Sequence, residues 1–138
     1  ENGLIVNTDT LFDWSRQDDN RIKYYSGHVL YTTTLDYKGQ PGGTKWLCFD
    51  KVYDVAHVWI NGRDCGIAWT YPYQVDITKA LKKGRNDVKI EVVNTWANAL
   101  RGADMGTPPY KGIWTNAKYR MKGDALLPAG IMGIKIKQ

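Results

Sequence analysis

Hydrophobic and polar residues alternate with a period of two along several short stretches of the chain, and this pattern predicts β-strands. The clearest stretch is 86–96, where apolar residues at every second position are separated by mostly charged ones. The stretch 131–137 alternates in the same way, with Ile134 and Ile136 expected inward and the lysines outward. Each of these strands is therefore expected to bury one face and expose the other.

Four further strands are predicted from runs rich in β-branched and aromatic residues, at 28–37, 46–50, 55–60 and 63–69. The last two runs are separated by Asn61 and Gly62. Asn-Gly favours a type I′ turn, because both central positions of that turn need a positive φ. These two strands are therefore expected to form an antiparallel hairpin.

The remaining segments show weaker patterns. Residues 1–27 are polar and irregular, and we expect a leading loop with room for one helical turn. A brief extended piece is predicted at 73–76 and a helical turn at 78–81. Between the last two strands, 97–130 shows no convincing strand or helix period, yet it is rich in aromatic residues. Long loops in compact domains are usually functional, so we expect an ordered loop over one end of the fold.

Short strands with turn signals between them indicate an all-β protein, and specifically a two-layer β-sandwich. A length of 138 residues fits one domain, covering 1–138. The aromatic residues are unusual, with 6 Trp and 9 Tyr against 2 Phe. Trp and Tyr combine a flat apolar body with a polar group, which suits surfaces that bind sugars. The alternative for any one of them is a packing role.

The charge distribution argues against nucleic acid as a partner. The net charge is +5, but the basic residues are spread along the chain rather than gathered in one stripe. No apolar run approaches the ~18 residues that a membrane span needs. The chain begins at Glu1 and shows no signal peptide, so we expect a module of something longer and infer no compartment from this end.

Residues that could carry catalysis by this chain alone are scarce. His28 and His57, the two histidines, fall within strand patterns, where a structural or surface role is expected. Neither serine lies in a G-x-S-x-G motif. Asp104 and Asp124 lie on the long loop, but nothing marks them as a catalytic pair of carboxylates. Independent catalysis is therefore not expected.

The two cysteines, Cys48 and Cys65, both lie in apolar strand-like segments. We expect buried free thiols, with a bridge between neighbouring strands as the alternative. They have no companion histidines at the spacing of zinc ligands, and no dense Asp/Asn/Gly run suggests calcium. No metal or other cofactor is expected.

Five segments, taken in order, carry a family resemblance. They are Arg21-Ile22-Lys23-Tyr24-Tyr25-Ser26-Gly27 with the strand that follows, the hairpin Asp54-Val55-Ala56-His57-Val58-Trp59-Ile60-Asn61-Gly62, Pro72-Tyr73-Gln74-Val75-Asp76-Ile77-Thr78, Asn86-Asp87-Val88-Lys89-Ile90-Glu91-Val92, and Leu127-Pro128-Ala129-Gly130-Ile131. Together they resemble a glycoside hydrolase family 2-type sugar-binding domain over nearly the whole chain. The resemblance implies a jelly-roll β-sandwich of the galactose-binding-domain-like type. The amino-acid sequence at 94–98 is similar to that of modules from large bacterial polysaccharide-degrading enzymes, including rhamnosidases.

The resemblance implies an ancillary function. Some domains of this kind bind sugar, some brace a catalytic barrel, and some lend a loop residue to its pocket. We expect a non-catalytic carbohydrate-binding module of a bacterial glycoside hydrolase that is secreted, periplasmic or on the cell surface. Its expected partners are a plant or host polysaccharide and the catalytic domain of the parent enzyme. The alternatives are an interdomain brace with no sugar site, and a lectin-like or protein-interaction domain.

A sugar site needs a flat aromatic face beside groups that bond hydroxyls. We expect it at the end of the sandwich that carries the long loop. The candidate platforms are Trp96, Tyr110 and Trp114, and the candidate polar partners are Asn94, Asn98, Arg101 and Asp104. Tyr24 and Tyr25 can reach the same end because they immediately precede a strand, whereas Trp69 and Tyr71 are expected to pack. The alternative is that the aromatics only pin the loop to the sandwich.

Overall fold

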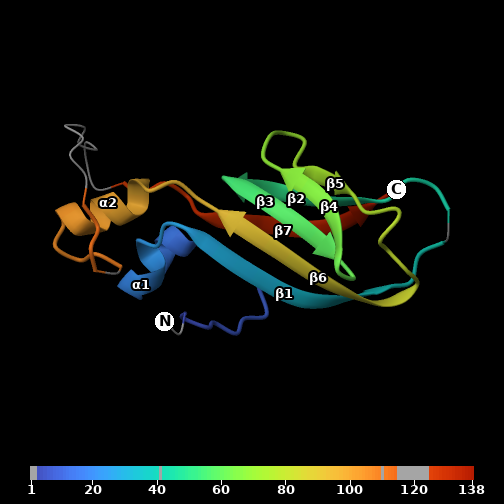
Figure 1. Cartoon of the computed structure of the whole chain (residues 1–138), viewed down its shortest axis with the longest axis horizontal. Helices are drawn as coiled ribbons and strands as arrows, with labels where there is room; N and C mark the ends of the chain where they lie inside the picture. The colour runs from blue at the N-terminus through green and yellow to red at the C-terminus, as the bar shows by residue number, and fades with distance from the viewer. Residues whose placement is uncertain (1–2, 41, 110, 115–124) are drawn as a thin grey trace.

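Two antiparallel β-sheets pack face to face, and the helical segments gather at one end of them (Figure 1). The structure is a computed structural model that describes residues 3–40, 42–109, 111–114 and 125–138. One sheet has the strand order β1 (His28–Tyr37), β6 (Gly84–Val93), β3 (Val55–Ile60) and β4 (Arg63–Ala68). The other has the order β5 (Gln74–Asp76), β2 (Trp46–Tyr53) and β7 (Gly130–Lys137). The helical segments are η1 (Trp14–Arg16), α1 (Asn20–Lys23) and α2 (Ala97–Asp104).

The core lies between the two sheets and confirms the predicted all-β sandwich. On β6, Val88, Ile90 and Val92 are buried, whereas Asp87 and Lys89 are exposed. The inner faces of the other strands supply the remaining large core residues, including Leu47, Phe49, Val58, Ile60 and Ile131. Burial of these side chains is the main source of stability, at about 1.5–3 kcal/mol for each large aliphatic residue.

The Asn-Gly hairpin forms as predicted between β3 and β4. Asn61 and Gly62 have φ values of 52° and 78°, as a type I′ turn requires. The register shifts at Val58/Trp59, where the ladder contains an irregularity. On the turn side of this shift Trp59 lies opposite Asp64, whereas beyond it Ala56 lies opposite Ala68 and not opposite Ile67. The end of β4 is therefore placed by the bulge as well as by the turn.

The predicted strands are all present, but some boundaries differ. β6 ends at Val93, three residues before the predicted end at Trp96, and β2 continues to Tyr53 rather than stopping at Asp50. The predicted turn at 78–81 is present, with the amides of Ala80 and Leu81 both donating to the carbonyl of Ile77. Cys48 is buried and Cys65 is half-buried, and both are free thiols.

The main correction concerns 97–130, which we expected to lack a helix. The structure places α2 there, and its buried face consists of Asn98, Ala99 and Gly102. Gly102 lies so close to Tyr24 that a Cβ atom on it would be 2.7 Å from Cγ of that ring. A helix that packs through small residues has no large apolar period, which is why the hydrophobic pattern missed it.

The first turns of the chain close the same end of the sandwich. The carboxylate of Asp13 accepts hydrogen bonds from the amides of Ser15 and Ala129, at 2.9 and 3.0 Å. The buried indole of Trp14 donates from Nε1 to Oη of Tyr31 at 2.7 Å. The bond to Ala129 attaches the N-terminal segment to the start of β7, and the bond to Tyr31 attaches it to β1. The leading loop of the prediction is therefore partly ordered into η1 and α1.

Candidate functional site

Six strand ends meet at the end of the sandwich that carries α2, which we call the α2 end. There β1, β3 and β7 begin, and β2, β4 and β6 end. The pairing of Val55 with Val93 and of Ala56 with Ala68 sets the residues just beyond these strands side by side. The α2 end therefore gathers residues from distant parts of the sequence, as the predicted sugar site requires.

Trp96 is the central exposed aromatic residue of the α2 end. It occupies the N-cap position of α2, and its side chain is 59% exposed. The preceding residue, Thr95, donates its amide hydrogen to Oδ2 of Asp54 at 3.1 Å, and both of these residues are exposed. Trp96 thus follows directly in sequence a residue whose backbone is bonded to the Asp54 carboxylate. An indole, a carboxylate and a hydroxyl are the group types that bind a sugar ring and its hydroxyls.

Trp69 and Tyr71 follow β4 at the same end, and the expectation that they pack is wrong. They are 66% and 85% exposed. Tyr71 makes an edge-on contact with Tyr73, whose ring centre is 6.3 Å away. The ladder of β3 and β4 pairs Ala68 with Ala56, so Trp69 comes directly after the last pair, near the start of β3. Asp54 and these two aromatics are thus residues of the α2 end that the sequence prediction did not assign to a site.

Asn98 and Asn94 have structural roles that differ from the predicted contact with sugar. Asn98 is 2% exposed, and its carboxamide bonds both the carbonyl and the amide of Leu127, at 2.7 and 2.9 Å. Asn94 bonds the amide of Gly27 at 2.8 Å and the carbonyl of Tyr25 at 3.0 Å. These carboxamides hold the chain in place at the α2 end.

Three other predicted residues are spread over this end rather than converging on one point. Arg101 is half-buried on α2, and Asp104 is exposed at its last position. Asp104 lies eight residues beyond Trp96, which is about 12 Å along a helix. Tyr25 packs edge-on against Trp14, with ring centres 6.2 Å apart, and donates from Oη to the carbonyl of His28. A single sugar ring at Trp96 would therefore not reach Asp104.

Trp114 is the other predicted platform that the structure describes, and it is 80% exposed. Tyr110 and Asp124 lie outside the described residues.

The part of the chain that the structure describes contains no group of three or more His, Cys, Asp or Glu side chains that could hold a metal ion. No helix among the described residues is long and apolar enough to cross a membrane.

The histidines pair with carboxylates on the outer face of the four-stranded sheet, as expected for surface strand residues. Nδ1 of His28 lies 2.6 Å from Oε1 of Glu91, and Nε2 of His57 lies 2.9 Å from Oδ1 of Asp64. The hydrogen bond from His57 lowers the pKa of Asp64, with the amide of Gly66 acting in the same direction. Burial raises the pKa of the Cys65 thiol. A thiol held in its neutral form is a poor nucleophile, so Cys65 does not suggest covalent catalysis.

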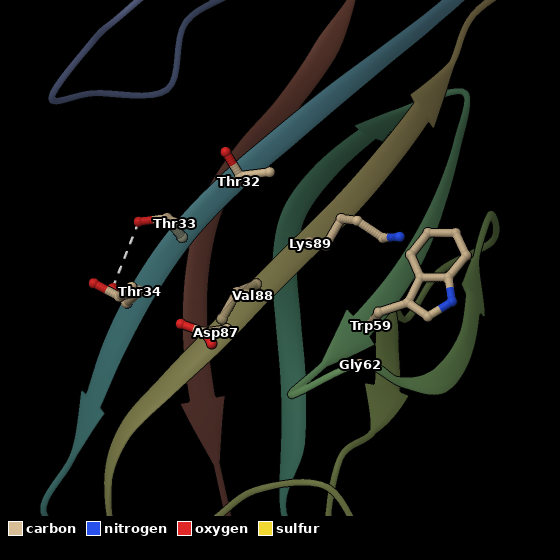
Figure 2. Close-up of a pocket in the computed structure, with 8 residues that line it drawn as sticks. All are labelled: Thr32, Thr33, Thr34, Trp59, Gly62, Asp87, Val88 and Lys89. Atoms are coloured by element: carbon tan, nitrogen blue, oxygen red, sulfur yellow. Dashed lines mark hydrogen bonds between the residues drawn. The ribbon is translucent and has the colours of Figure 1, made fainter.

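A shallow groove on this outer face is the second candidate surface, and it holds about 600 Å³ (Figure 2). It crosses β1, β6 and β3 near the Asn-Gly turn. Its lining residues are Thr32, Thr33, Thr34, Trp59, Gly62, Asp87, Val88 and Lys89. Figure 2 shows Lys89 extending toward the indole of Trp59. The Nζ atom of Lys89 lies 4.5 Å from the centre of that ring.

The two packed antiparallel sheets define a β-sandwich domain. A family model described as "Glycosyl hydrolase 2 galactose-binding domain-like" matches residues 8–124. The chain belongs to this family, and the family implied by the resemblance is confirmed.

Similar proteins are much longer than this chain. A rhamnosidase of Novosphingobium sp. PP1Y has a solved structure that is 35% identical, with a TM-score of 0.76 over 89% of this chain and 12% of that one. A protein of Formosa agariphila named "Putative beta-glucuronidase" is 32% identical over 70% of this chain and 9% of its own length. A β-glucuronidase structure from Ruminococcus gnavus, 22% identical with a TM-score of 0.52 over 59% of this chain and 15% of that one, shares the fold.

The chain thus spans only 9–12% of the length of its two more similar relatives. It matches a small domain of a glycoside hydrolase family 2-type enzyme, and it is not an enzyme on its own. The catalytic function of such enzymes lies in their other domains.

Proposed function

We propose that this domain is a non-catalytic carbohydrate-binding module of a larger glycoside hydrolase and that it contacts carbohydrate through its α2 end. The observation that carries the proposal is the exposed indole of Trp96 at the start of α2, directly after Thr95, whose amide is bonded to the Asp54 carboxylate, with Trp69 exposed just beyond the end of β4. The indole supplies a flat surface for the apolar face of a pyranose ring, and the carboxylate accepts hydrogen bonds from its hydroxyls.

The support around Trp96 suits a preorganised site. Asp54 fixes the chain just before α2, and Asn98 and Ser26 fix the helix itself, since the Ala99 amide donates to Oγ of Ser26 at 3.1 Å. Little conformational freedom would be lost when a ligand binds to side chains held in this way. In the parent enzyme, the catalytic domain would lie next to the α2 end, so that both domains contact one carbohydrate chain.

The names of the relatives guide the choice of ligands to test. One relative is a rhamnosidase and another is named as a glucuronidase, so we propose glycans that contain rhamnose or glucuronic acid. Because such polysaccharides occur outside the cytoplasm, a secreted, periplasmic or cell-surface enzyme is part of the proposal.

The second candidate function is an interdomain brace with no sugar site. The hydrogen bonds of Asn94, Asn98 and Asp13 favour it, because they join distant backbone segments and so make the α2 end rigid. A brace and a binding module would share these bonds, but only the module uses the exposed face of Trp96.

Affinity electrophoresis and isothermal titration with a panel of rhamnose- and glucuronate-containing oligosaccharides separate the two. We expect binding by the 138-residue chain and a loss of about tenfold in affinity in Trp96→Ala, since one well-placed aromatic contact is worth about 1 kcal/mol or more. Leu30→Ala is the matched control, because Leu30 has the same exposed fraction, 59%, on β1. Absence of binding across the panel would favour the brace.

A further inference from the structure

The groove on the outer face of the four-stranded sheet is separate from the α2 end. Trp59 lies four residues from Val55 along β3, which corresponds to about 13 Å in a strand. The floor of the groove is formed by paired strands, with Thr32 opposite Lys89 and Thr34 opposite Asp87. Trp59 is opposite Lys89 on the other side of β6. One row of the sheet therefore carries a hydroxyl, an ammonium group and an indole in sequence.

The indole of Trp59 is held in place by His57, a neighbour on the same face of β3. His57 stacks against it with ring centres 3.8 Å apart and an interplanar angle of 29°. His57 is in turn held by its hydrogen bond to Asp64 at 2.9 Å. The ring is thus preorganised by a neighbour that is itself anchored, as in a built recognition surface.

The polar groups around the indole remain accessible. The side chain of Asp87 is 76% exposed, and its ion pair with Arg85 is long, at 3.8 Å. Lys89 is exposed, and a cation over an aromatic ring is held only weakly at exposed sites. A ligand can therefore engage both charged groups without breaking a buried interaction.

The composition of the groove indicates the class of ligand. Among the residues that the structure describes, its lining carries one cation, one anion, one indole and three threonines across β6 from that indole, and Val88 is its one aliphatic residue. Nucleic acid would require an excess of positive charge, and a protein partner would require a larger apolar centre. A neutral pattern of donors, acceptors and one flat apolar surface complements a polyhydroxylated ring.

We propose that this groove is a second carbohydrate-binding site, which takes a pyranose unit of an oligosaccharide. Trp59 packs against the apolar face of the ring, Asp87 accepts hydrogen bonds from its hydroxyls, and Lys89 donates to them (Figure 2). The inference shares the ligand class of the proposed function but uses none of the residues of the α2 end. An enzyme with both sites would hold a polysaccharide at two points on one domain, which raises its effective affinity.

Titration calorimetry in a background that lacks the first site tests the inference. In the Trp96→Ala/Trp69→Ala chain, the same oligosaccharide panel should still bind, and adding Trp59→Ala should weaken that binding by about tenfold or more. Lys89→Ala and Asp87→Ala alter exposed side chains, so they test the groove without disturbing the core, and each should weaken binding by several-fold.

Leu30→Ala, on the same outer face of β1, is the control and should leave the affinity unchanged. If the Trp96→Ala/Trp69→Ala chain binds no oligosaccharide, or if Trp59→Ala, Lys89→Ala and Asp87→Ala all leave its affinity unchanged, the second site is refuted. The proposed function fails separately, if Trp96→Ala alone leaves the affinity of the unaltered chain unchanged.

Discussion

The carboxamide of Asn98 holds the backbone of Leu127 by two hydrogen bonds. Nδ2 donates to the Leu127 carbonyl at 2.7 Å, and Oδ1 accepts from the Leu127 amide at 2.9 Å. The two residues are 29 positions apart, so this contact joins α2 to the segment that leads into β7. It therefore fixes the position of α2 relative to that segment.

Asn98→Ala is therefore expected to destabilise the domain. It would leave a backbone donor and a backbone acceptor without their partners, at a cost of about 2 kcal/mol or more. Urea unfolding measures the loss. Asp104→Ala, at an exposed position on the same helix, should stay within about 0.5 kcal/mol of the original chain. Equal stability of the two variants would contradict this role of Asn98.

Gly102→Ala is expected to destabilise α2, although alanine normally stabilises a helix relative to glycine by about 1 kcal/mol. The reason is that the added Cβ would lie 2.7 Å from Cγ of Tyr24 and 2.9 Å from its Cβ. In a Tyr24→Ala background the contact with Cγ is removed, whereas the contacts with Cβ of residue 24 at 2.9 Å and with the Thr107 carbonyl at 3.0 Å remain, so the same substitution should cost less but should not become stabilising. A smaller cost in the Tyr24→Ala background, measured by urea unfolding, supports the close packing of Gly102 against the ring of Tyr24, whereas the same cost in both backgrounds would refute it.

Tyr31→Phe should lower stability at neutral pH by about 1–3 kcal/mol, because the buried Nε1–H of Trp14 loses its acceptor. Burial raises the pKa of Tyr31 above its usual 10.0. The contribution of its neutral phenol is thus complete below pH 10 and is lost as the pH rises through the folded-state value. The difference in unfolding free energy between the two proteins should shrink above pH 10, and a constant difference up to pH 11 would contradict it.

Asp76→Asn tests acid stability. Hydrogen bonds from the hydroxyl and the amide of Thr78 lower the pKa of Asp76 below its usual 3.8. The carboxylate therefore stabilises the fold above pH 3.8, and this contribution is lost as the pH falls through the folded-state value. The stability difference between Asp76→Asn and the original chain should be largest near neutral pH and shrink below pH 4. Thr78→Ala removes the hydroxyl that donates to Asp76 and should reduce this pH dependence. If the stability difference between Asp76→Asn and the original chain persists unchanged to pH 2, the stabilising role of the bond between Thr78 and Asp76 is contradicted.

The strands could be predicted because their alternation and turn chemistry are local. Asn61 and Gly62 specify the hairpin, and the β6 pattern specifies its buried face. The end of β4 could not be placed by counting from the turn, since the bulge at Val58/Trp59 shifts the register by one residue. Gly66, with a φ of 97°, is the local signal that could have indicated it.

The sugar site stays a prediction, and only some of the residues assigned to it are exposed at the α2 end. Trp96 is exposed there as expected. The carboxamide of Asn98 is instead hydrogen-bonded to the backbone of Leu127, which belongs to a distant segment of the chain. Trp69 was expected to pack because it flanks the exit of the hairpin, but it is 66% exposed just beyond the end of β4. Such non-local features follow from tertiary pairing and leave little trace in a local pattern.

The central claim, that carbohydrate binds at Trp96, is tested most directly by the indole signals of the six tryptophans in a ¹⁵N-labelled chain. On titration with a rhamnose- or glucuronate-containing oligosaccharide, the account predicts that the signals of Trp96 and Trp69 shift and saturate together. The signal of buried Trp14, which is bonded to Tyr31, should remain in place as an internal reference. A Trp96 signal that does not move at any concentration, for every sugar of the panel, would contradict the account.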